Sequence, residues 1–300
     1  MRVLVTGGAG FIGSHVVEAL LRRGDAVTVL DDLSSGQRAN LPTGATLVVG
    51  DVAEAARVAG LSETAEAIIH LAAIASVPVC EGEPERAYRT NVEGTEAVFA
   101  AAASRGIPVV YASSAAVYGD NPDLPLAETA PLRPLGHYGR HKLENEAIAA
   151  RYGAHVASTG LRFFNVYGPR QDPKSPYSGV ISIFAEKAQN GQTLTFYGDG
   201  EQTRDFIYVG DIARLVLRAL ETSRGVRVFN GCTGQATSLK QLAATLGDVL
   251  QLPLATAYAS ARAGDIRHSL GNPDHARNAL GFEAKTMLDE GLRHLLGAAQ

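Results

Sequence analysis

Near its start the chain reads Thr6-Gly-Gly-Ala-Gly-Phe-Ile-Gly13, three spaced glycines between two apolar segments. The segment before it, residues 3–6, is a short apolar run that is typical of a strand. The segment after it, residues 14–21, carries apolar residues at helical spacing. The stretch therefore predicts a strand, a tight turn and a helix, which is the opening unit of many nucleotide-binding α/β folds.

The three spaced glycines of this turn, Gly7, Gly10 and Gly13, each have an expected task. Gly7 permits the tight turn, Gly10 lets the backbone approach a pyrophosphate, and Gly13 lets the helix pack closely on the strand. Unpaired N–H groups at the start of the helix face the negative charge of the phosphates. These glycines are therefore predicted to bind a dinucleotide, together with Phe11 and Ile12 of the same stretch.

The next predicted strand, residues 26–30, ends in two acids, Asp31 and Asp32. They stand about 20 residues after the glycines, where a dinucleotide site places a carboxylate for the ribose hydroxyls. No arginine adjoins them, and a 2′-phosphate would be repelled, so the pair favours NAD over NADP. The polar loop that follows, including Ser35 and Gly36, is expected to hold the adenosine ribose.

The composition bounds the class of protein. The 300 residues include 46% hydrophobic and 19% charged residues, with a net charge of −4, which is ordinary for a globular protein and suggests no nucleic-acid or membrane partner. No apolar run reaches the length of a membrane span, and the chain enters a strand at once, so no signal peptide is expected. Cys80 and Cys232 match no metal or redox spacing, which predicts no metal site and a reducing cytoplasm.

Strand and helix patterns alternate as far as Arg170 and then become shorter and more irregular. This predicts an α/β fold, a doubly wound parallel sheet, with a smaller second lobe. The dinucleotide-binding domain is expected over residues 1–166, joined by a helix near residues 206–226 that returns to it. The second domain is expected over residues 167–205 and 227–300.

Further cofactor contacts are predicted at the carboxyl ends of the strands. Asp51 follows a strand and could accept from an adenine amino group, although a helix N-cap explains it equally well, and Val52 adjoins it. Asn91, within a helix predicted over residues 83–104, could bind backbone or cofactor. His70 is expected to be a packed core histidine. The small residues after it, which let a dinucleotide lie flat, are Leu71, Ala72 and Ala73.

The candidate chemistry comes from Ser113, Ser114, Tyr138 and Lys142. The serines follow the strand at residues 108–112, where a parallel sheet places its substrate, although serines also form ordinary turns. Tyr138 and Lys142 are four residues apart and share one helix face. An ammonium near a phenol favours phenolate, which can give a base near neutral pH. The spacing alone also occurs on ordinary helices.

Aromatic and basic residues later in the chain remain open to two interpretations. Phe163 and Phe164 could wall a nicotinamide ring or belong to the core. Arg204 and Arg262 are candidate diphosphate ligands, because a guanidinium binds phosphate through two hydrogen bonds. Two surface arginines are the alternative.

The combination resembles the extended short-chain dehydrogenase/reductases, specifically their NAD-dependent nucleotide-sugar epimerases and dehydratases, and most closely the UDP-hexose 4-epimerases. The matching residues run along almost the whole chain: Thr6-Gly-Gly-Ala-Gly-Phe-Ile-Gly13, Asp31, Asp51-Val52, His70-Leu-Ala-Ala73, Asn91-Val-Glu-Gly-Thr95, Ser113-Ser114, Tyr138 with Lys142, Arg162-Phe-Phe-Asn165-Val-Tyr-Gly-Pro-Arg170, residues 198–206 and Arg262-Ala-Gly-Asp265.

The resemblance implies a Rossmann-type fold, tightly bound NAD and hydride transfer through a transient 4-keto sugar. Ser114 and Tyr138 would contact the sugar 4-oxygen, and Lys142 would hold the nicotinamide ribose, with Phe163 and Phe164 near the nicotinamide. It also implies a homodimer through a four-helix bundle built from the helices at residues 83–104 and 140–152. The implied UDP-sugar contacts are Asn165, Arg204 and Arg262 at the phosphates, Asp265 at the ribose, Thr195 and Tyr197 at the uracil, Val180 and Ile181 at the border, and Ala75, Gly179 and Ser269 near the sugar C2 substituent.

Departures from the family pattern bear on the subclass. Ala115 and Ala116 stand where related dehydratases and decarboxylases carry an acid, which argues against elimination chemistry. Asn165 and Asp172 differ from the residues usual in UDP-glucuronate 4-epimerases, which remain the alternative. The small Ser269 predicts that N-acetyl sugars are accepted. An NAD-binding sensor module is the non-enzymatic alternative, and the intact Ser114, Tyr138 and Lys142 argue against it.

Overall fold

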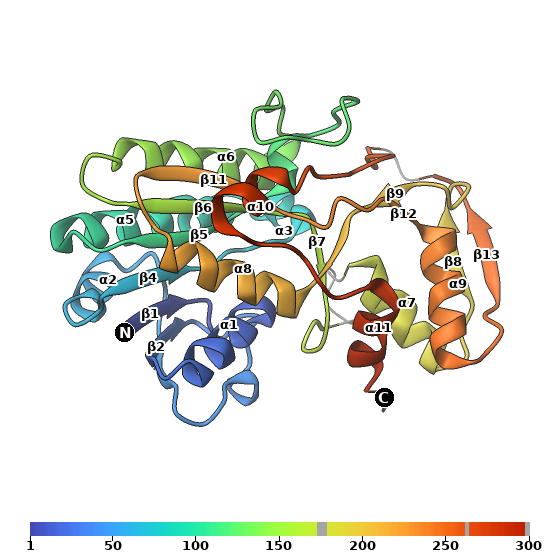
Figure 1. The fold of residues 1–300 in the computed structure, drawn as a ribbon, viewed down its shortest axis with the longest axis horizontal. Coiled ribbons are helices and arrows are strands. Elements are labelled where there is room, and N and C mark those ends of the chain that lie inside the picture. Colours follow the sequence, from blue (N-terminus) through green and yellow to red (C-terminus); the bar gives the residue numbers. More distant parts are fainter. Residues whose placement is uncertain (173–178, 262–263, 298–300) are drawn as a thin grey trace.

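The computed structural model describes residues 1–172, 179–261 and 264–297. Its main feature is a seven-stranded sheet in the order β11-β6-β5-β4-β1-β2-β3, in which every pair of neighbours is parallel (Figure 1). The strand order reverses between β1 and β4, which makes the carboxyl ends of these two strands the expected nucleotide site. The strands are β1 (Arg2–Thr6), β2 (Ala26–Asp31), β3 (Thr46–Val49), β4 (Ala67–His70), β5 (Val109–Ser114), β6 (Ser158–Phe163) and β11 (Val226–Gly231).

Helices cover both faces of this sheet (Figure 1). On one face, apolar side chains of α1 (Phe11–Arg22), α8 (Val209–Glu221) and α10 (Asp274–Leu280) form one buried cluster with the strands. On the other face, α2 (Ala55–Ser62), α5 (Gly94–Arg105) and α6 (Gly136–Arg151) form a second cluster. The predicted doubly wound parallel sheet is confirmed.

The helix predicted over residues 83–104 is built from three segments. Pro84 starts α4 (Pro84–Tyr88), a position where its missing N–H costs nothing. A π-helical turn, Arg89–Glu93, then leads into α5, and a separate short helix, α3 (Val77–Gly82), precedes α4. The π turn carries Asn91, and such turns are frequent at functional sites. Single 3₁₀ turns occur at Arg38–Asn40 and Ala115–Val117.

The second half of the chain adds a smaller layer of short strands and helices. Its buried core includes Phe184, Phe196, Leu242 and Leu292. Its strands pair in twos: β7 (Asn165–Tyr167) with β10 (Phe206–Tyr208), β8 (Leu194–Tyr197) with β13 (Thr256–Ala259), and β9 (Thr203–Arg204) with β12 (Thr237–Ser238). Its helices are α7 (Val180–Gln189), α9 (Leu239–Leu250) and α11 (Leu288–Leu296).

Two stretches, β11 and α10, differ from the predicted domain boundary. β11 pairs with β6 at the edge of the large sheet, and Ala276 and Leu280 of α10 belong to the apolar cluster under that sheet. These parts of the predicted second domain therefore pack with the first, because the apolar face of β11 and α10 is buried there. Among the described residues, no helix combines the length and apolar character needed to cross a bilayer.

Candidate active site

The glycine turn leaves almost no space between β1 and α1. Gly7 has φ +71°, and a Cβ on it would lie 2.6 Å from the backbone nitrogen of Ala72. A Cβ on Gly13 would lie 2.0 Å from the carbonyl oxygen of Gly7. A Cβ on Gly10 would lie 3.3 Å from the same oxygen and would have no other atom within 4 Å. Gly7 and Gly13 are thus required by close packing, whereas Gly10 leaves the cleft beside it open.

A cleft of about 670 Å³ opens at the carboxyl ends of these strands. It gathers most of the predicted cofactor residues in one place, although their binding roles stay predictions: Gly7, Gly10, Phe11, Ile12, Gly13, Asp31, Asp32, Ser35, Asp51, Val52, Leu71, Ala72, Ala73 and Phe163, with Ala75 from the predicted substrate set. It also includes residues to which the sequence assigned no binding role, among them Gln37, Asn40, Arg86, Thr90, Arg170 and Gln171.

Asp31 is held in place by backbone amides. Its carboxylate accepts from the N–H of Ala9 and of Leu33, both at 2.9 Å. Gly36 lies directly against this carboxylate, since a Cβ there would be 2.8 Å from Oδ1. Burial raises the pKa of Asp31, and the two amides oppose that shift. The end of β2 therefore presents a fixed acceptor at the expected ribose position.

Asp51 lies at the cleft with both carboxylate oxygens occupied within the chain. Oδ1 accepts from the N–H of Ala53 at 2.8 Å, and Oδ2 pairs with Arg89 at 2.9 Å. The N-cap alternative is wrong, because α2 begins at Ala55 and Glu54 occupies its cap. An adenine contact by Asp51 stays a prediction.

Asn91 and His70 hold buried segments together. The Asn91 side chain accepts from the N–H of Ile74 at 2.7 Å and donates to its carbonyl oxygen at 3.0 Å, the backbone-binding alternative from the sequence. His70 contacts Thr6 at 2.7 Å and Thr95 at 3.0 Å. Burial lowers the pKa of His70 to about 3, so it is a neutral core histidine, as predicted.

The candidate catalytic groups meet where β5 ends against α6. Lys142 is buried and donates to the carbonyl oxygen of Ala112 at 3.0 Å, and its Nζ lies 5.8 Å from the centre of the Tyr138 ring. Ser114 hydrogen-bonds the Tyr138 hydroxyl. The predicted serine, tyrosine and lysine are therefore brought together from positions up to 28 residues apart in the sequence (142 − 114).

The ionisation of Tyr138 differs from the sequence prediction. Burial raises its pKa to about 12, against a smaller lowering by the Ser114 hydrogen bond. Burial also lowers the pKa of Lys142 to about 8. The sequence predicts that Lys142 beside the phenol can give a base near neutral pH. In the protein by itself the pKa of Tyr138 stays raised, because desolvation of the phenolate outweighs the nearby ammonium.

A buried ion pair lies directly behind this group. Glu146 of α6 receives two hydrogen bonds from Arg162 of β6, at 2.9 and 2.7 Å, and one from Ser113 of β5, at 2.6 Å. Arg162 also donates to the Tyr118 hydroxyl at 2.9 Å. The sequence singled out Ser113 as a candidate, but its hydroxyl serves this network, which fixes α6 against the strand ends.

Phe163 and Phe164 point to different surroundings. Phe163 lines the cleft, consistent with the predicted nicotinamide wall. Phe164 is buried in a separate apolar cluster with Val117, Tyr118 and Leu126. Successive residues of an extended chain face opposite sides, which accounts for the split. For Phe164 the structure favours the core alternative.

The predicted substrate residues lie beyond the cleft, on the smaller layer. Thr195 and Tyr197 share one side of β8, opposite the buried Leu194 and Phe196. Burial lowers the pKa of the Arg204 guanidinium, and the nearby Asp265 opposes this. Such a desolvated cation is suited to binding a phosphate.

Other predicted substrate residues have less direct support. Ile181 is 2% exposed within the apolar core of the smaller layer, and its predicted border contact stays a prediction. Ser269 is half-buried, and its N–H is bonded to the carbonyl oxygen of Thr203. Arg262 lies outside the described residues. The remaining members start elements of the smaller layer: Gly179 and Val180 at α7, and Asn165 at β7.

His141 and Gly210 were given no role by the sequence, and the structure shows what surrounds each of them. His141 is buried, with Nδ1 3.4 Å from the amide nitrogen of Asn91 and an edge contact with Tyr88. A Cβ on Gly210 would lie 2.7 Å from the Tyr208 ring, so a larger residue there would force the ring to move.

The comparisons with known proteins agree with this geometry. The model of the NAD dependent epimerase/dehydratase family matches residues 3–231. The chain belongs to this family. A UDP-glucose 4-epimerase of Mycolicibacterium smegmatis is 36% identical, over 97% of this chain and 96% of the relative.

Two solved structures of 4-epimerases are similar to this chain over almost its whole length. The UDP-glucose 4-epimerase of Thermotoga maritima with UDP-glucose is 36% identical, with a TM-score of 0.95 over 99% of this chain and 98% of that one. The UDP-N-acetylglucosamine 4-epimerase of Methanobrevibacter ruminantium, in complex with UDP-N-acetylmuramic acid, has the same identity and TM-score over 99% and 97%.

The residues of the cleft fit the NAD of this family. The open side of Gly10 leaves room for a pyrophosphate, the first amides of α1 face it, and the carboxylate of Asp31 is fixed at the ribose end. The cleft also continues to Phe163, next to the Ser114–Tyr138–Lys142 group.

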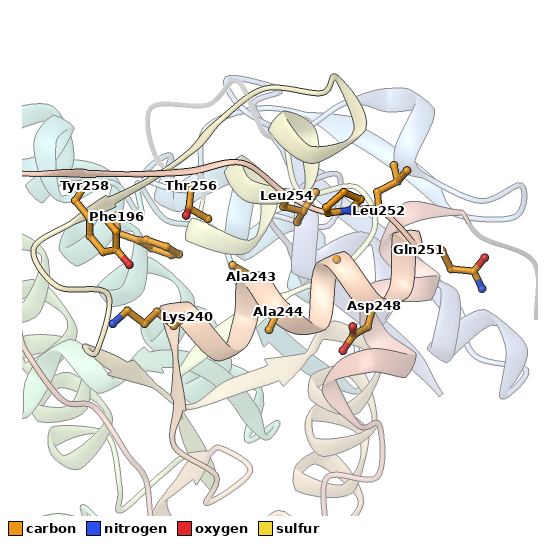
Figure 2. A pocket seen from close by; sticks show the side chains of 12 residues that line it. Phe196, Lys240, Ala243, Ala244, Asp248, Gln251, Leu252, Leu254, Thr256 and Tyr258 are labelled. Carbon is orange, nitrogen blue, oxygen red and sulfur yellow. The ribbon is translucent and has the colours of Figure 1, made fainter.

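A second hollow of about 680 Å³ lies between α9 and β13 (Figure 2). Its lining includes exposed Tyr258 and Leu252 and the small residues Ala243 and Ala244. Lys240, at one end of the hollow, is paired with Glu201. The candidate catalytic groups and the cofactor residues lie at the edge of the large sheet and not in this hollow. The hollow beside α9 is lined by both polar and apolar side chains.

Proposed function

We propose that the protein catalyses the NAD-dependent 4-epimerisation of a UDP-hexose through a transient 4-keto sugar. The observation that carries this is the meeting of Ser114, Tyr138 and Lys142 beside a dinucleotide cleft. Homologues and structural neighbours named as UDP-sugar 4-epimerases support the substrate class.

The chain's own residues have distinct tasks in this mechanism. Bound NAD supplies reversible hydride acceptance. Tyr138 takes the proton of the sugar 4-hydroxyl and returns it, and Ser114 stabilises the phenolate through its hydrogen bond. Lys142, held by the carbonyl of Ala112, places a positive charge next to the ring. Burial alone holds the pKa of Tyr138 at about 12, so a positive charge bound beside the phenol would favour the phenolate that this role needs.

The nucleotide must stay anchored while the 4-keto sugar presents its other face. We propose that Arg204 and Arg262 bind the diphosphate with Asn165, that Asp265 binds the ribose, and that Thr195 and Tyr197 line the uracil site. The half-buried guanidinium of Arg204 supports this assignment. Firm binding of the UDP part leaves the sugar free to turn between two reactive orientations.

The small Ser269 supports acceptance of UDP-N-acetylhexoses as well as UDP-hexoses. The name of the Methanobrevibacter neighbour points the same way. We expect Ser269→Tyr to abolish UDP-N-acetylglucosamine conversion while UDP-glucose conversion persists. Equal loss of both activities, or loss of neither, would show that Ser269 does not select the C2 substituent.

Proton NMR of the purified protein with UDP-glucose, UDP-N-acetylglucosamine and UDP-glucuronate, each without added NAD, tests the proposal. The galacto anomeric signal is expected from the first two. Conversion of UDP-glucuronate alone would establish the glucuronate alternative. A protein that carries NAD but converts none of them, even with NAD supplied, would act on another nucleotide sugar or be a sensor module.

We also propose a homodimer through α5 and α6, with the protein in the cytoplasm. We keep the two-domain division as a proposal, with β11 and α10 assigned to the dinucleotide-binding domain. Both cysteines are free and buried, which suits a reducing compartment. Ala97 and Ala101 of α5 already pack inside the chain, so the face left for a partner is a mixture of charged and small residues. Its exposed members on α5, on α6 and just before α5 include Glu93, Ala100, Arg140, Glu144 and Ala147. Sedimentation analysis at low and high salt tests the dimer.

A further inference from the structure

Residues 168–172, which follow β7, run beside the first turns of α1. We call these residues the strap. Arg170 and Gln171 line the dinucleotide cleft together with Gly10, Phe11 and Gly13. The strap thus borders the place where the helix N-terminus is expected to bind the pyrophosphate. It is distant in sequence from the glycine turn, so specific contacts must hold it there.

Two contacts tie the strap to α1. The imidazole of His15 donates from Nε2 to the carbonyl oxygen of Pro169 at 2.9 Å. The Arg170 guanidinium donates to Glu18 Oε2 at 2.7 Å, and Glu18 Oε1 lies 3.1 Å from Arg22. At the other end of the strap, the Ser182 hydroxyl of α7 donates to Gln171 Oε1 at 2.6 Å. The strap is therefore fixed at both ends.

The backbone at Arg170 has a conformation that would suit glycine better than arginine. The N–H of Gln171 bonds to the carbonyl of Gly168 at 3.4 Å, with Pro169 second and Arg170 third in the turn. Arg170 has φ +67°, a conformation that favours glycine at the third position of such a turn. An arginine held in this strained position, with its guanidinium on Glu18, points to a function for the ion pair.

We propose that the strap, through the Arg170–Glu18 pair and the His15–Pro169 hydrogen bond, slows the release of NAD from the cleft. This rests on the proposed function only in taking NAD as the cofactor. Because α1 supplies both the phosphate-binding N-terminus and the anchor for the strap, the same helix binds the cofactor and holds the segment that borders it.

The test counts the NAD that stays bound through gel filtration, released afterwards by acid and measured per chain. Wild type is expected to retain it, whereas Arg170→Ala and Glu18→Gln release it about fivefold faster, the effect of a partly exposed ion pair. Arg22→Ala is the matched control, because it removes the other partner of Glu18 and leaves the strap attached. It should retain NAD like wild type.

The charge-swapped double variant, Glu18→Arg with Arg170→Glu, separates a tether from a direct phosphate ligand. A tether predicts that retention returns toward wild type, whereas a direct ligand predicts further loss of NAD. Wild-type retention in Arg170→Ala and Glu18→Gln, equal loss in Arg22→Ala, or no recovery in the swap would overturn the proposal. A strap that behaves as expected in a protein that converts no UDP-hexose would overturn the proposed function alone.

Discussion

At the scale of single residues, burial rather than charge governs Tyr138. Its hydroxyl has a hydrogen bond from Ser114, and the ammonium of Lys142 lies 5.8 Å from the ring centre, yet burial keeps the pKa near 12. The protein alone therefore holds the group as a phenol at neutral pH. Because a positive charge beside it favours the phenolate, we expect binding of the oxidised cofactor and activation of the base to be coupled.

A pH titration of tyrosinate absorbance tests this coupling. In protein stripped of NAD, wild type and Tyr138→Phe should show the same tyrosinate signal up to about pH 10, because a raised pKa keeps Tyr138 protonated there. With NAD restored, wild type should gain extra signal at lower pH and Tyr138→Phe should not. The variant should also lose about 10²–10⁴-fold in kcat. Extra tyrosinate near neutral pH without NAD would contradict the account.

At the scale of elements, two buried polar networks hold the site together. The Glu146–Arg162 pair joins α6 to β6 and, through Ser113, to β5. His70 joins β4 to β1 through Thr6 and to α5 through Thr95. The first network positions α6, which carries Tyr138 and Lys142, and the second positions the end of β4 beside the glycine turn. Each therefore helps to place site residues that it does not contact.

Glu146→Gln should destabilise the protein strongly. The side chains of Arg162 and Glu146 are 5% and 10% exposed, so the variant leaves a buried guanidinium facing a neutral amide. A loss of about 3–5 kcal/mol in the free energy of unfolding is expected from denaturant titration. The control is Asp289→Asn in the exposed Arg293–Asp289 pair, with an expected loss below about 1 kcal/mol. Similar losses in both variants would show that the buried pair has no special weight.

His70 gives stability a specific pH dependence. The unfolded chain binds a proton at His70 below its ordinary pKa of 6.5, whereas the folded chain does so only near 3. The folded state therefore loses stability as the pH falls through this window, by about 1 kcal/mol per pH unit. The difference in unfolding free energy between wild type and His70→Asn should be constant above pH 7. From pH 6 to 4, wild type should lose more stability than the variant. A constant difference throughout would be the contrary result.

At the scale of the whole molecule, local patterns predicted the sheet and tertiary contacts decided the rest. The glycine turn and the acid after β2 follow short-range rules, and both lie where the sequence predicted. The burial of Phe164 and Ile181 could not be predicted in this way, because the cluster that buries each comes from segments distant in sequence. The role of Arg170 was likewise hidden, since its partner Glu18 is 152 residues away.

Removing NAD should lower the stability of the entire chain. The cleft takes residues from the glycine turn to the strap, and Gln171 of the strap is bonded to Ser182 of α7, so we expect bound NAD to stabilise both parts of the fold. A ligand at about 100 times its Kd adds about 2.7 kcal/mol, or roughly 5 °C in Tm for a protein of this size. Thermal unfolding with and without added NAD measures this shift. At the same NAD concentration, Arg170→Ala should gain less than wild type and Arg22→Ala the same amount. If NAD raised all three melting temperatures equally, the strap would add nothing to cofactor affinity at equilibrium.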